Sequence, residues 1–403
     1  MNRKNAVLSE GSQLVADRSI SRIINQRTLI NSIFKSDGIS KSELAKELKL
    51  SKPAVSKNVA DLIAMGLVNE RGEGRVGVSG GRKPVMLYFN ESHRYIGALD
   101  LSFQEPVCAI GDLQCKVLTL KKIQIDRSTP VDEKKNYVWQ TFMDMLQELN
   151  VPAEKMGAIV ISQPGIIGDD GESLYSEARH HVWTGIGLKQ YLKERCGVPV
   201  LVKNDVNLAA IGEMHLGAYN QIKNLIYVTC GIGLGSGVII DGKLYEGCNR
   251  AAGELGEFLR EDGRRVEDAV AIEGLLRRLR LMYAESGKCD AACEKLRFSD
   301  VVKLAKDKDS TVNRAVYDIG RELGGIIYNC SVMFDIKTVI FGGEYLNLGK
   351  TLFDGIEAVL EQKFPFRPEV FPSSLRESAG IYGGFVVGKD EILNRMIQDE
   401  TYA

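Results

Sequence analysis

The sequence predicts an α/β protein in two parts, a small N-terminal module and a large domain in which strands alternate with helices. Three observations lead to this fold class. A chain of 403 residues is too long for one ordinary core, so two or three globular units are expected. The positive charge gathers at the N-terminal end of the chain. Beyond Tyr95, short β-branched runs alternate with helical stretches, as in mixed α/β layers.

The net charge of −1 conceals an asymmetry along the chain. Residues 1–90 carry 15 Lys and Arg against 8 Asp and Glu, a charge of +7. The remaining residues carry 37 against 45, a charge of −8. A basic segment of this kind suits a polyphosphate partner such as nucleic acid. A solvated basic face is the alternative explanation.

Composition also bears on location and on metals. No apolar run reaches the roughly 18 residues of a membrane span, and the first residues lack the apolar stretch of a signal peptide. We therefore expect a cytoplasmic protein with no membrane partner. No two cysteines have the C-x2-C or C-x-C spacing of a zinc site, so we expect them to be reduced core residues. The eight are Cys108, Cys115, Cys196, Cys230, Cys248, Cys289, Cys293 and Cys330.

Two closely spaced helix starts lie in the N-terminal module. Ser40 is a good N-cap, and Glu43 three residues later completes a capping box. Leu44, Ala45 and Leu48 then recur at helical spacing, which indicates one buried face. An upstream helix is expected to support this face through a set of apolar residues. They are Ile23, Ile24, Leu29, Ile30, Ile33 and Phe34.

The second helix begins after Ser51, with Pro53 in its first turn, where the missing N–H would have been unpaired anyway. Its apolar stripe consists of Val55, Val59, Leu62 and Ile63. The opposite face, near the N-terminus, is where a recognition helix contacts DNA. This face carries Lys52, Ala54, Ser56, Lys57 and Asn58, of which we predict that Lys52, Ser56, Lys57 and Asn58 contact DNA.

A glycine-rich hairpin follows. Gly66 ends the second helix, Leu67 and Val68 begin a strand, and residues 71–83 are rich in glycine and arginine before the strand-like run 85–89. Arg82 and Lys83 are predicted to contact the adjacent groove of DNA. The order of elements over residues 1–88 resembles a winged helix-turn-helix, and GGRKP at 80–84 resembles the wing of repressors in the ROK family of repressors and kinases. A helical hairpin for protein contact is the alternative.

The large domain is expected to span residues 89–403. Strand-like runs are IGALDL, CAIGDL, MGAIVIS, VPVLVKND, NLIYVTC and SGVIIDGKLY, and helical stretches such as 131–149 intervene. The first strands follow one another without helices, which favours the two-lobed, actin-like ATPase fold of sugar kinases over a Rossmann-like sheet, the alternative. We place the boundary between the lobes near 205–215, with a C-terminal helix returning to the first lobe.

One motif of this domain supplies the first ligand-contacting candidates. LVKNDVNLAAIGE, residues 201–213, resembles the ROK segment whose Asp accepts a proton from the sugar hydroxyl. Asp205 takes that position, beside Asn204. An Asp at the end of a strand can be oriented by backbone amides and a helix start. The alternative is that Asp205 is only the N-cap of the helix 206–215.

Two further motifs are glycine turns. TCGIGLGSGVIIDGKLYEG, residues 229–247, resembles the turn in which a Thr of ROK kinases contacts the transferred phosphoryl group, but Ile232 stands there and donates no side-chain hydrogen bond. VIFGGE, residues 339–344, resembles the glycine pair near the nucleotide and precedes a helix expected at 348–362. A purely structural turn is the alternative.

AAGELGEF, residues 251–258, resembles the ROK motif whose Glu contacts sugar hydroxyls and whose His helps to hold zinc. Glu254 is the retained Glu, whereas Glu257 replaces the His and a shorter loop without cysteine follows. We therefore predict no metal site. Glu267 aligns with a second sugar-contacting Glu of the family. Its alternative role is an exposed carboxylate at a helix start.

Other positions depart from the kinases. The stretch from Asp100 to Glu105 lacks the Gly and Thr of the family's phosphate-binding hairpin, and Phe103 and Glu105 disfavour a triphosphate. After the Pro-Gly turn at 164–165, Trp183 remains but the family's sugar-binding Asn is absent. Arg179 and His180 lie nearest its position and are predicted to contact a ligand, such as a carboxylate or phosphate, with a solvated loop as the alternative.

Together the resemblance implies a sugar-responsive repressor of a carbohydrate-utilisation operon, such as one for xylose, and not an enzyme. A homodimer, or a dimer of dimers, would bind operator DNA and take a sugar or sugar derivative between the lobes, with no cofactor. An ATP-dependent sugar kinase with an N-terminal DNA-binding appendage is the main alternative. A protein-interaction scaffold is the third.

Overall fold

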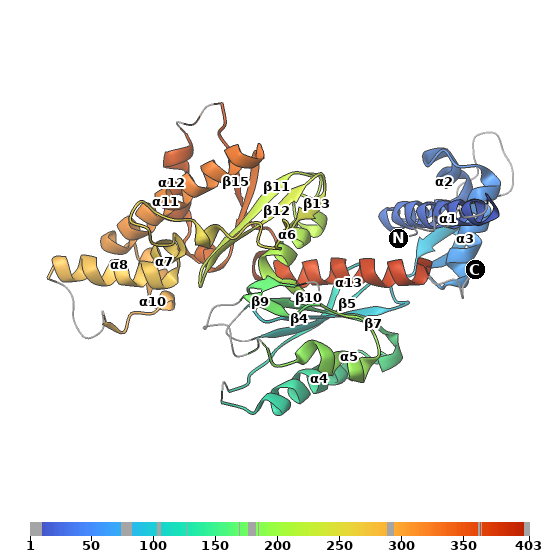
Figure 1. The fold of residues 1–403 in the computed structure, drawn as a ribbon, viewed down its shortest axis with the longest axis horizontal. Helices are drawn as coiled ribbons and strands as arrows, with labels where there is room; N and C mark the ends of the chain where they lie inside the picture. Colours follow the sequence, from blue (N-terminus) through green and yellow to red (C-terminus); the bar gives the residue numbers. More distant parts are fainter. Residues whose placement is uncertain are drawn as a thin grey trace, which may run out of the picture.

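The computed structural model shows a small N-terminal module followed by two lobes, with the C-terminal helix running along the first lobe from the place where the lobes meet to the module (Figure 1). It describes residues 10–73, 83–102, 106–126, 128–168, 170–175, 183, 185–287, 294–361, 363 and 365–398. In these residues no helix is long and apolar enough to cross a membrane.

The N-terminal module is a winged helix-turn-helix, as predicted. Its helices are α1 (Glu10–Lys35), α2 (Lys41–Glu47) and α3 (Lys52–Ala64). Its strands are β1 (Ile39–Ser40), β2 (Val68–Glu73) and β3 (Val85–Phe89), which form an antiparallel sheet in the order β1-β3-β2.

Local signals explain where these helices begin and end. The Ser40 hydroxyl accepts the N–H of Glu43, and the Glu43 carboxylate accepts the N–H of Ser40, which completes the predicted capping box. Ser51 caps α3, and Gly66 takes a φ of 75° just after α3. The expected packing of Ile24 is wrong, because its side chain is 57% exposed.

The first lobe is built on a five-stranded sheet with the order β10-β7-β4-β5-β6. Helices α4 (Val131–Glu148) and α5 (Leu188–Cys196) pack on one face through a shared apolar core. The strands are β4 (Tyr95–Asp100), β5 (Val107–Asp112), β6 (Val117–Lys122), β7 (Met156–Gln163) and β10 (Val200–Asn204), with a short turn η1 (Ala153–Lys155) and a small hairpin of β8 (Ile166–Ile167) and β9 (Ser173–Tyr175).

The second lobe repeats this plan with the strand order β13-β12-β11-β14-β15. Its strands are β11 (Leu225–Cys230), β12 (Leu234–Ile240), β13 (Lys243–Tyr245), β14 (Thr338–Gly342) and β15 (Glu369–Pro372). Its helices are α7 (Glu267–Val270), α8 (Ile272–Glu285), α10 (Phe298–Lys306), α11 (Ser310–Phe334) and α12 (Lys350–Leu360), with the short turns η3 (Leu255–Glu257), η4 (Glu344–Leu348) and η5 (Arg376–Ser378).

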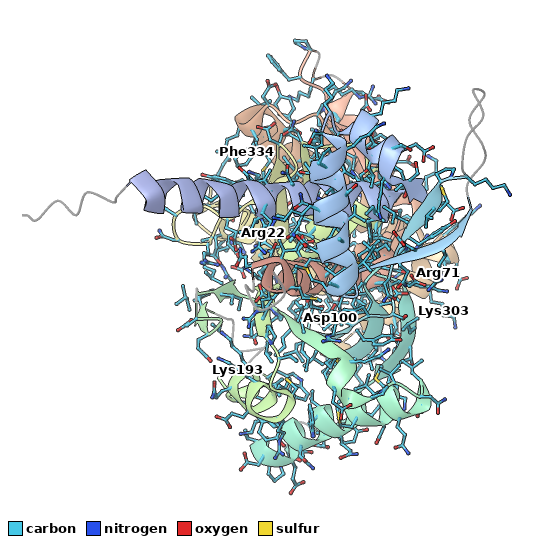
Figure 2. All side chains as sticks on the ribbon, turned by 90° about the vertical axis from the view of Figure 1, so that its right-hand side faces the viewer. Arg22, Arg71, Asp100, Lys193, Lys303 and Phe334 are labelled. Atoms are coloured by element: carbon cyan, nitrogen blue, oxygen red, sulfur yellow. The ribbon has the colours of Figure 1, made fainter. Side chains whose placement is uncertain are left out.

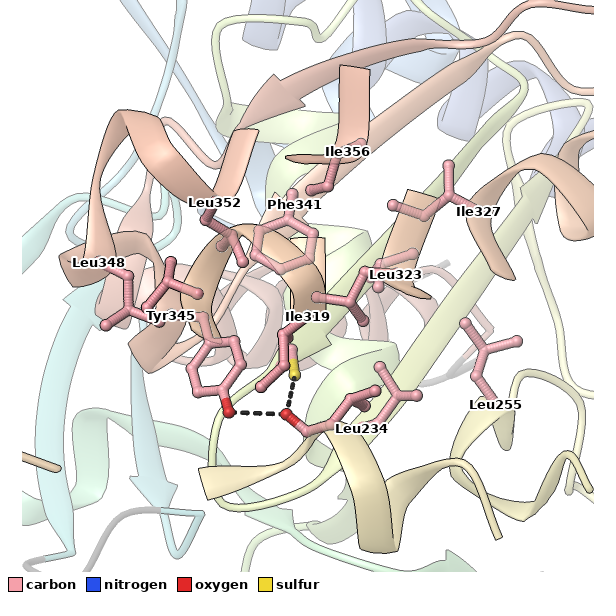
Figure 3. Close-up of a cluster of buried hydrophobic side chains, with 14 of the residues drawn as sticks. Leu234, Leu255, Ile319, Leu323, Ile327, Phe341, Tyr345, Leu348, Leu352 and Ile356 are labelled. Carbon is pink, nitrogen blue, oxygen red and sulfur yellow. Dashed lines mark hydrogen bonds between the residues drawn. The ribbon is translucent and has the colours of Figure 1, made fainter. Parts of the chain in front are cut away.

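A buried cluster holds the helices of the second lobe against its sheet (Figure 3). Ile319 and Leu323 of α11 meet Phe341 of β14 and Tyr345 of η4, all fully buried. The Tyr345 hydroxyl donates to the carbonyl of Val270 over 2.6 Å, so the polar end of this ring is satisfied inside the core.

The matching order of the two sheets decides between the expected folds. In each lobe the first three strands are antiparallel neighbours, and the fourth and fifth add in parallel on the other side of the first. This mixed pattern is that of the predicted actin-like lobes. The Rossmann-like alternative is wrong, because its sheet would be formed by parallel strands with helical crossovers.

Two helices lie where the lobes meet. Helix α6 (Asp205–Leu216) packs on β11 and β12, and α13 (Ala379–Gln398) packs on β4 and β7. They cross closely at Gly383, where an added Cβ would lie 1.8 Å from the carbonyl oxygen of Leu208. The two helices are therefore in close backbone contact at this point.

The far end of α13 reaches the N-terminal module (Figure 1). Ile392, Leu393 and Ile397 belong to the same buried cluster as Leu29 and Ile30 of α1. The ammonium of Lys389 lies 4.6 Å from the centre of the Phe34 ring. The core of the module is thus continuous with that of the first lobe.

The cysteine expectation holds in part. Cys108, Cys115, Cys230 and Cys330 are buried and free, and Cys196 is half-buried. The expectation of a core position is wrong for Cys248, which is exposed. Cys289 and Cys293 lie outside the described residues.

Candidate ligand cavity and DNA-binding face

A cavity of about 540 Å³ opens between the two lobes. Its walls come from the ends of β4, β10, β11 and β14 and from the first residues of α6 and α13. These strand ends meet because each is followed by a turn at the same edge of its sheet. A cavity of this size is within the range of small-molecule sites.

Asn204 and Asp205 both line this cavity, at the junction of β10 and α6. The Asn204 side chain caps α6 by accepting the N–H of Asn207 over 2.9 Å, and its amide donates to the carbonyl of Gly165. The alternative that Asp205 caps the helix is therefore wrong. The carboxylate of Asp205 is left to face the cavity, where burial and the nearby Asp100 raise its pKa to about 7.

Asp100 was not among the predicted ligand-contacting residues, although it lines the same cavity. Its side chain is 2% exposed at the end of β4, and it accepts hydrogen bonds from the N–H and the hydroxyl of Ser102. Burial raises the pKa of this carboxyl group. Its position at a strand end was a usable signal, but Asp100 and Asp205 meet only in the folded chain.

Glu254 and Glu267 lie on the opposite wall. Burial, followed by the charges of Glu257 and Glu267, raises the pKa of Glu254. Glu267 is 9% exposed and accepts the N–H of Leu234 over 2.8 Å. The alternative of an exposed carboxylate is wrong for Glu267, because this buried side chain connects the start of α7 to the end of the glycine turn through its hydrogen bond with Leu234.

The loop after Glu254 is closed by ion pairs. Arg265 contacts Glu257 over 2.9 Å and Asp268 over 3.0 Å, and a β-bridge joins Leu259 to Arg265. These contacts connect the segments that carry Glu254 and Glu267. Across the residues that the structure describes, no three His, Cys, Asp or Glu side chains gather as metal ligands would.

The cavity is strongly acidic. Seven carboxyl groups line it, and Arg376 is the sole Lys or Arg in the described part of its wall. The seven belong to Asp100, Asp205, Glu254, Glu257, Glu267, Glu344 and Glu377. Ile232 also lines the cavity, at the position where the sequence predicted a lost hydrogen-bond donor. Closely spaced carboxylates accept hydrogen bonds from hydroxyl groups and repel anions.

Two predicted ligand contacts cannot be placed. Arg179 and His180 lie outside the described residues. Nearby, Trp183 is 8% exposed and packs with the apolar core of the first lobe. The ring therefore belongs to the lobe core.

Most of the predicted DNA contacts in α3 share one exposed face. The side chains of Lys52, Ser56 and Lys57 are all exposed. The placement of Asn58 on this face is wrong, because Asn58 is 6% exposed and its amide donates to the carbonyl of Ala54 over 2.8 Å. Asn58 lies on the buried side of α3, together with Val55, Val59 and Leu62.

The wing carries the remaining contacts. Lys83 is exposed just before β3, whereas Arg82 lies outside the described residues. Arg71, on β2, is a further exposed cation on the same module (Figure 2). Lys46 in α2 and Lys49 after it are exposed as well. Neither lysine stands out in the sequence, because charge alone does not identify the face that it occupies.

Two family models match the chain. The model of the ROK family matches residues 96–391, and that of the MarR family matches residues 24–76. Among solved structures, a ROK family transcriptional regulator, a homologue of the Escherichia coli MLC protein, has a TM-score of 0.77 at 21% identity, over 94% of this chain and 98% of that one. A ROK glucokinase from Streptomyces griseus, in complex with glucose and AMPPNP, has a TM-score of 0.61 at 21% identity, over 73% of this chain and 98% of that one.

Two relatives match nearly the whole length of the chain. The xylose repressor of Bacillus subtilis is 26% identical over 94% of this chain and 98% of its own. The transcriptional regulator NagC of Escherichia coli is 22% identical over 96% of this chain and 97% of its own. The similarity thus joins the N-terminal module and both lobes in one architecture.

Proposed function

The chain belongs to the ROK family, with a MarR-type DNA-binding domain ahead of the ROK domain, and from this premise we propose that it is a sugar-responsive transcriptional repressor of a carbohydrate-utilisation operon. Its relatives include proteins named xylose repressor, which makes xylose a candidate effector. We assign DNA binding to residues 1–88 and sugar sensing to residues 89–403.

Helix α13 is the observation that carries this proposal. Its first residues, Ala379 and Gly380, line the cavity, and Ile397 in its last turn shares a core with α1. A helix of 20 residues spans about 30 Å. One rigid element therefore connects the ligand cavity to the module that would hold DNA.

The segment before α13 connects the cavity to this helix. The buried carboxylate of Glu213, in α6, accepts the hydroxyls of Ser373 and Ser374 over 2.6 and 2.8 Å and the N–H of Leu375 over 2.9 Å. Residues 375–380 then line the cavity. A ligand that draws the lobes together would shift α6, this segment and α13, and so change the population of DNA-binding states.

The sugar would be held by carboxylate and amide groups from both lobes. Asn204 and Asp205 approach from the first lobe, and Glu254 and Glu267 from the second. Hydroxyl groups of a sugar donate to such acceptors, and closing the lobes would engage both walls at once. Arg179 and His180 remain proposed contacts of the same ligand.

DNA would be bound by the exposed face of α3 and by the wing. Lys52, Ser56 and Lys57 would enter the major groove, with Arg82 and Lys83 at the adjacent groove. A homodimer, or a dimer of dimers, would present two such helices to a near-palindromic operator. Sedimentation of the free protein and of the operator complex measures that assembly.

The kinase alternative is less well supported. Ile232 offers no side-chain donor at the turn, and seven carboxyl groups face the space that a triphosphate would enter. We propose that the domain has no phosphotransferase activity and uses no cofactor. Formation of sugar phosphate from ATP by the purified chain, lost in Asp205→Ala, would establish the alternative instead.

The deciding experiment is fluorescence-anisotropy binding to DNA from upstream of its own gene, at stated salt, with and without a panel of sugars. A repressor binds one sequence specifically, and one sugar changes that affinity. We expect Asp205→Ala to abolish the sugar effect and leave binding without sugar near normal. Lys57→Ala should weaken all DNA binding and reduce the salt dependence by about one counterion. Binding without sequence preference would contradict the proposal.

A further inference from the structure

Glu344 lines one end of the cavity, where its side chain lies against the glycine turn after β11. It follows Gly342 and Gly343 at the carboxyl end of β14, which pairs in parallel with β11. Its carboxylate lies against the turn after β11, so close that a Cβ added to Gly231 would lie 1.7 Å from Oε2 of Glu344. The Glu344 carboxylate therefore fills the space beside Gly231.

The backbone of the turn explains what the carboxylate does there. The N–H of Gly231 donates to the carbonyl of Gly233 within the turn, whereas the N–H of Ile232 lies beside the Glu344 carboxyl group, whose pKa burial raises and this amide lowers. A backbone amide in a glycine-rich turn is a common donor to an anion such as phosphate. Here a carboxylate of the protein itself lies beside that donor.

The negative charges around Glu344 also disfavour a phosphoryl group. Glu377 lies near enough to Glu344 for their charges to interact, and the charge of Asp100 acts on Asp205 in the same cavity. A phosphoryl group that entered the cavity would not gain a hydrogen bond from the Ile232 amide. It would also approach several carboxylates in an enclosed space. A neutral hydroxylated ligand would meet acceptors instead.

We propose that Glu344 closes this end of the cavity to phosphoryl groups, so that the effector is an unphosphorylated, uncharged sugar and neither a sugar phosphate nor a nucleotide. This inference rests on the proposed function, because it names the ligand class of the same cavity. Glu344 is a specificity-determining residue whose carboxylate stands where a phosphoryl group would bind.

The first test compares each neutral sugar with its phosphate in the operator-binding assay. The probes are xylose, glucose and N-acetylglucosamine, against glucose 6-phosphate and N-acetylglucosamine 6-phosphate. We expect one neutral sugar to change operator affinity at least tenfold and both phosphates to leave it unchanged. A response to a phosphate alone would overturn the inference and leave the proposed function standing. If neither the sugars nor the sugar phosphates changed operator binding, the result would contradict both the inference and the proposed function.

The second test removes the carboxylate. Glu344→Ala frees the Ile232 amide, and Glu344→Gln removes the charge while it keeps an acceptor for that amide. Binding of inorganic phosphate and of Mg²⁺-AMPPNP is measured by calorimetry, with Glu361→Gln, an exposed carboxylate at the end of α12, as the control. We expect at least tenfold tighter phosphate binding in Glu344→Ala, a smaller gain in Glu344→Gln and none in the control. The inference would be overturned if both Glu344 variants bound operator DNA normally and bound phosphate no more tightly than the unmodified chain does.

Discussion

The DNA-binding module and the ligand cavity are built in opposite ways. The module is specified by signals a few residues apart, such as Ser40 with Glu43, or Gly66 at the end of α3. The cavity is assembled from strand ends far apart in the chain, among them Asp100, Asp205 and Glu344. We expect that local capping can be changed without disturbing the cavity, whereas the cavity depends on how both lobes pack around α6 and α13.

The largest effect that tests this comparison is expected in the core of the module. Leu62 is fully buried in α3, and Leu62→Ala should lower the free energy of unfolding by about 2–5 kcal/mol because it leaves a cavity. Operator binding should be lost while sugar binding by calorimetry persists. Leu281→Ala, at a side chain that is 61% exposed, is the control. Loss of sugar binding in Leu62→Ala would show that the two regions do not fold separately.

The contact between α6 and α13 comes next. Gly383→Ala places a methyl group against the Leu208 carbonyl, so the helices must separate, at a cost of about 1–3 kcal/mol. We also expect the sugar to lose its effect on operator affinity. The matched control is Gly325→Ala in α11, where an added Cβ meets nothing within 4 Å. Urea unfolding and the operator assay measure both effects, and an unchanged sugar response would exclude α13 as the connection.

A pH-dependent effect is expected at Asp205. Its pKa is raised to about 7, so its neutral form is favoured by folding, and the stability that goes with this form is lost as the pH rises through 7. Asp205→Asn keeps a neutral side chain at every pH. At pH 8 the Tm of this variant should exceed that of the unmodified chain by about 2–4 °C, which corresponds to about 2–3 kcal/mol in a chain of 403 residues. The difference should shrink as the pH falls below 7 and vanish near pH 4, where the carboxyl group of the unfolded chain is protonated as well. A difference independent of pH would contradict this assignment.

The smallest effect concerns the capping box. Ser40→Ala removes the acceptor for the Glu43 N–H and should cost about 1 kcal/mol. The same change at Ser56 is the control, because Ser56 is exposed on α3 and takes no part in a cap. Thermal unfolding reports the cost, while sugar affinity should stay the same. A sugar affinity that falls with the cap would show that the cavity also depends on the local signals of the module.

Much of the molecule follows from the sequence by itself. Caps, glycines and apolar periodicity determined the helices and strands of the winged module, and β-branched runs determined the strands of both lobes. Asn204, Asp205, Glu254 and Glu267 were assigned to a ligand site from motifs, and all four line the cavity. These features depend on neighbours within a few positions, so the order of residues carries them.

Tertiary structure decided the rest. The sequence placed Asn58 on the exposed face of α3, whereas in the folded module it is buried on the side of Val55 and Val59. Asp100 acquires its raised pKa and its neighbour Asp205 only when β4 and β10 join one sheet. Glu344 meets Gly231 because β14 pairs with β11 across more than a hundred residues of chain, a pairing that strand propensity does not specify. Which strand ends share an edge is set by the packing of whole lobes, and that packing determines what the cavity can bind.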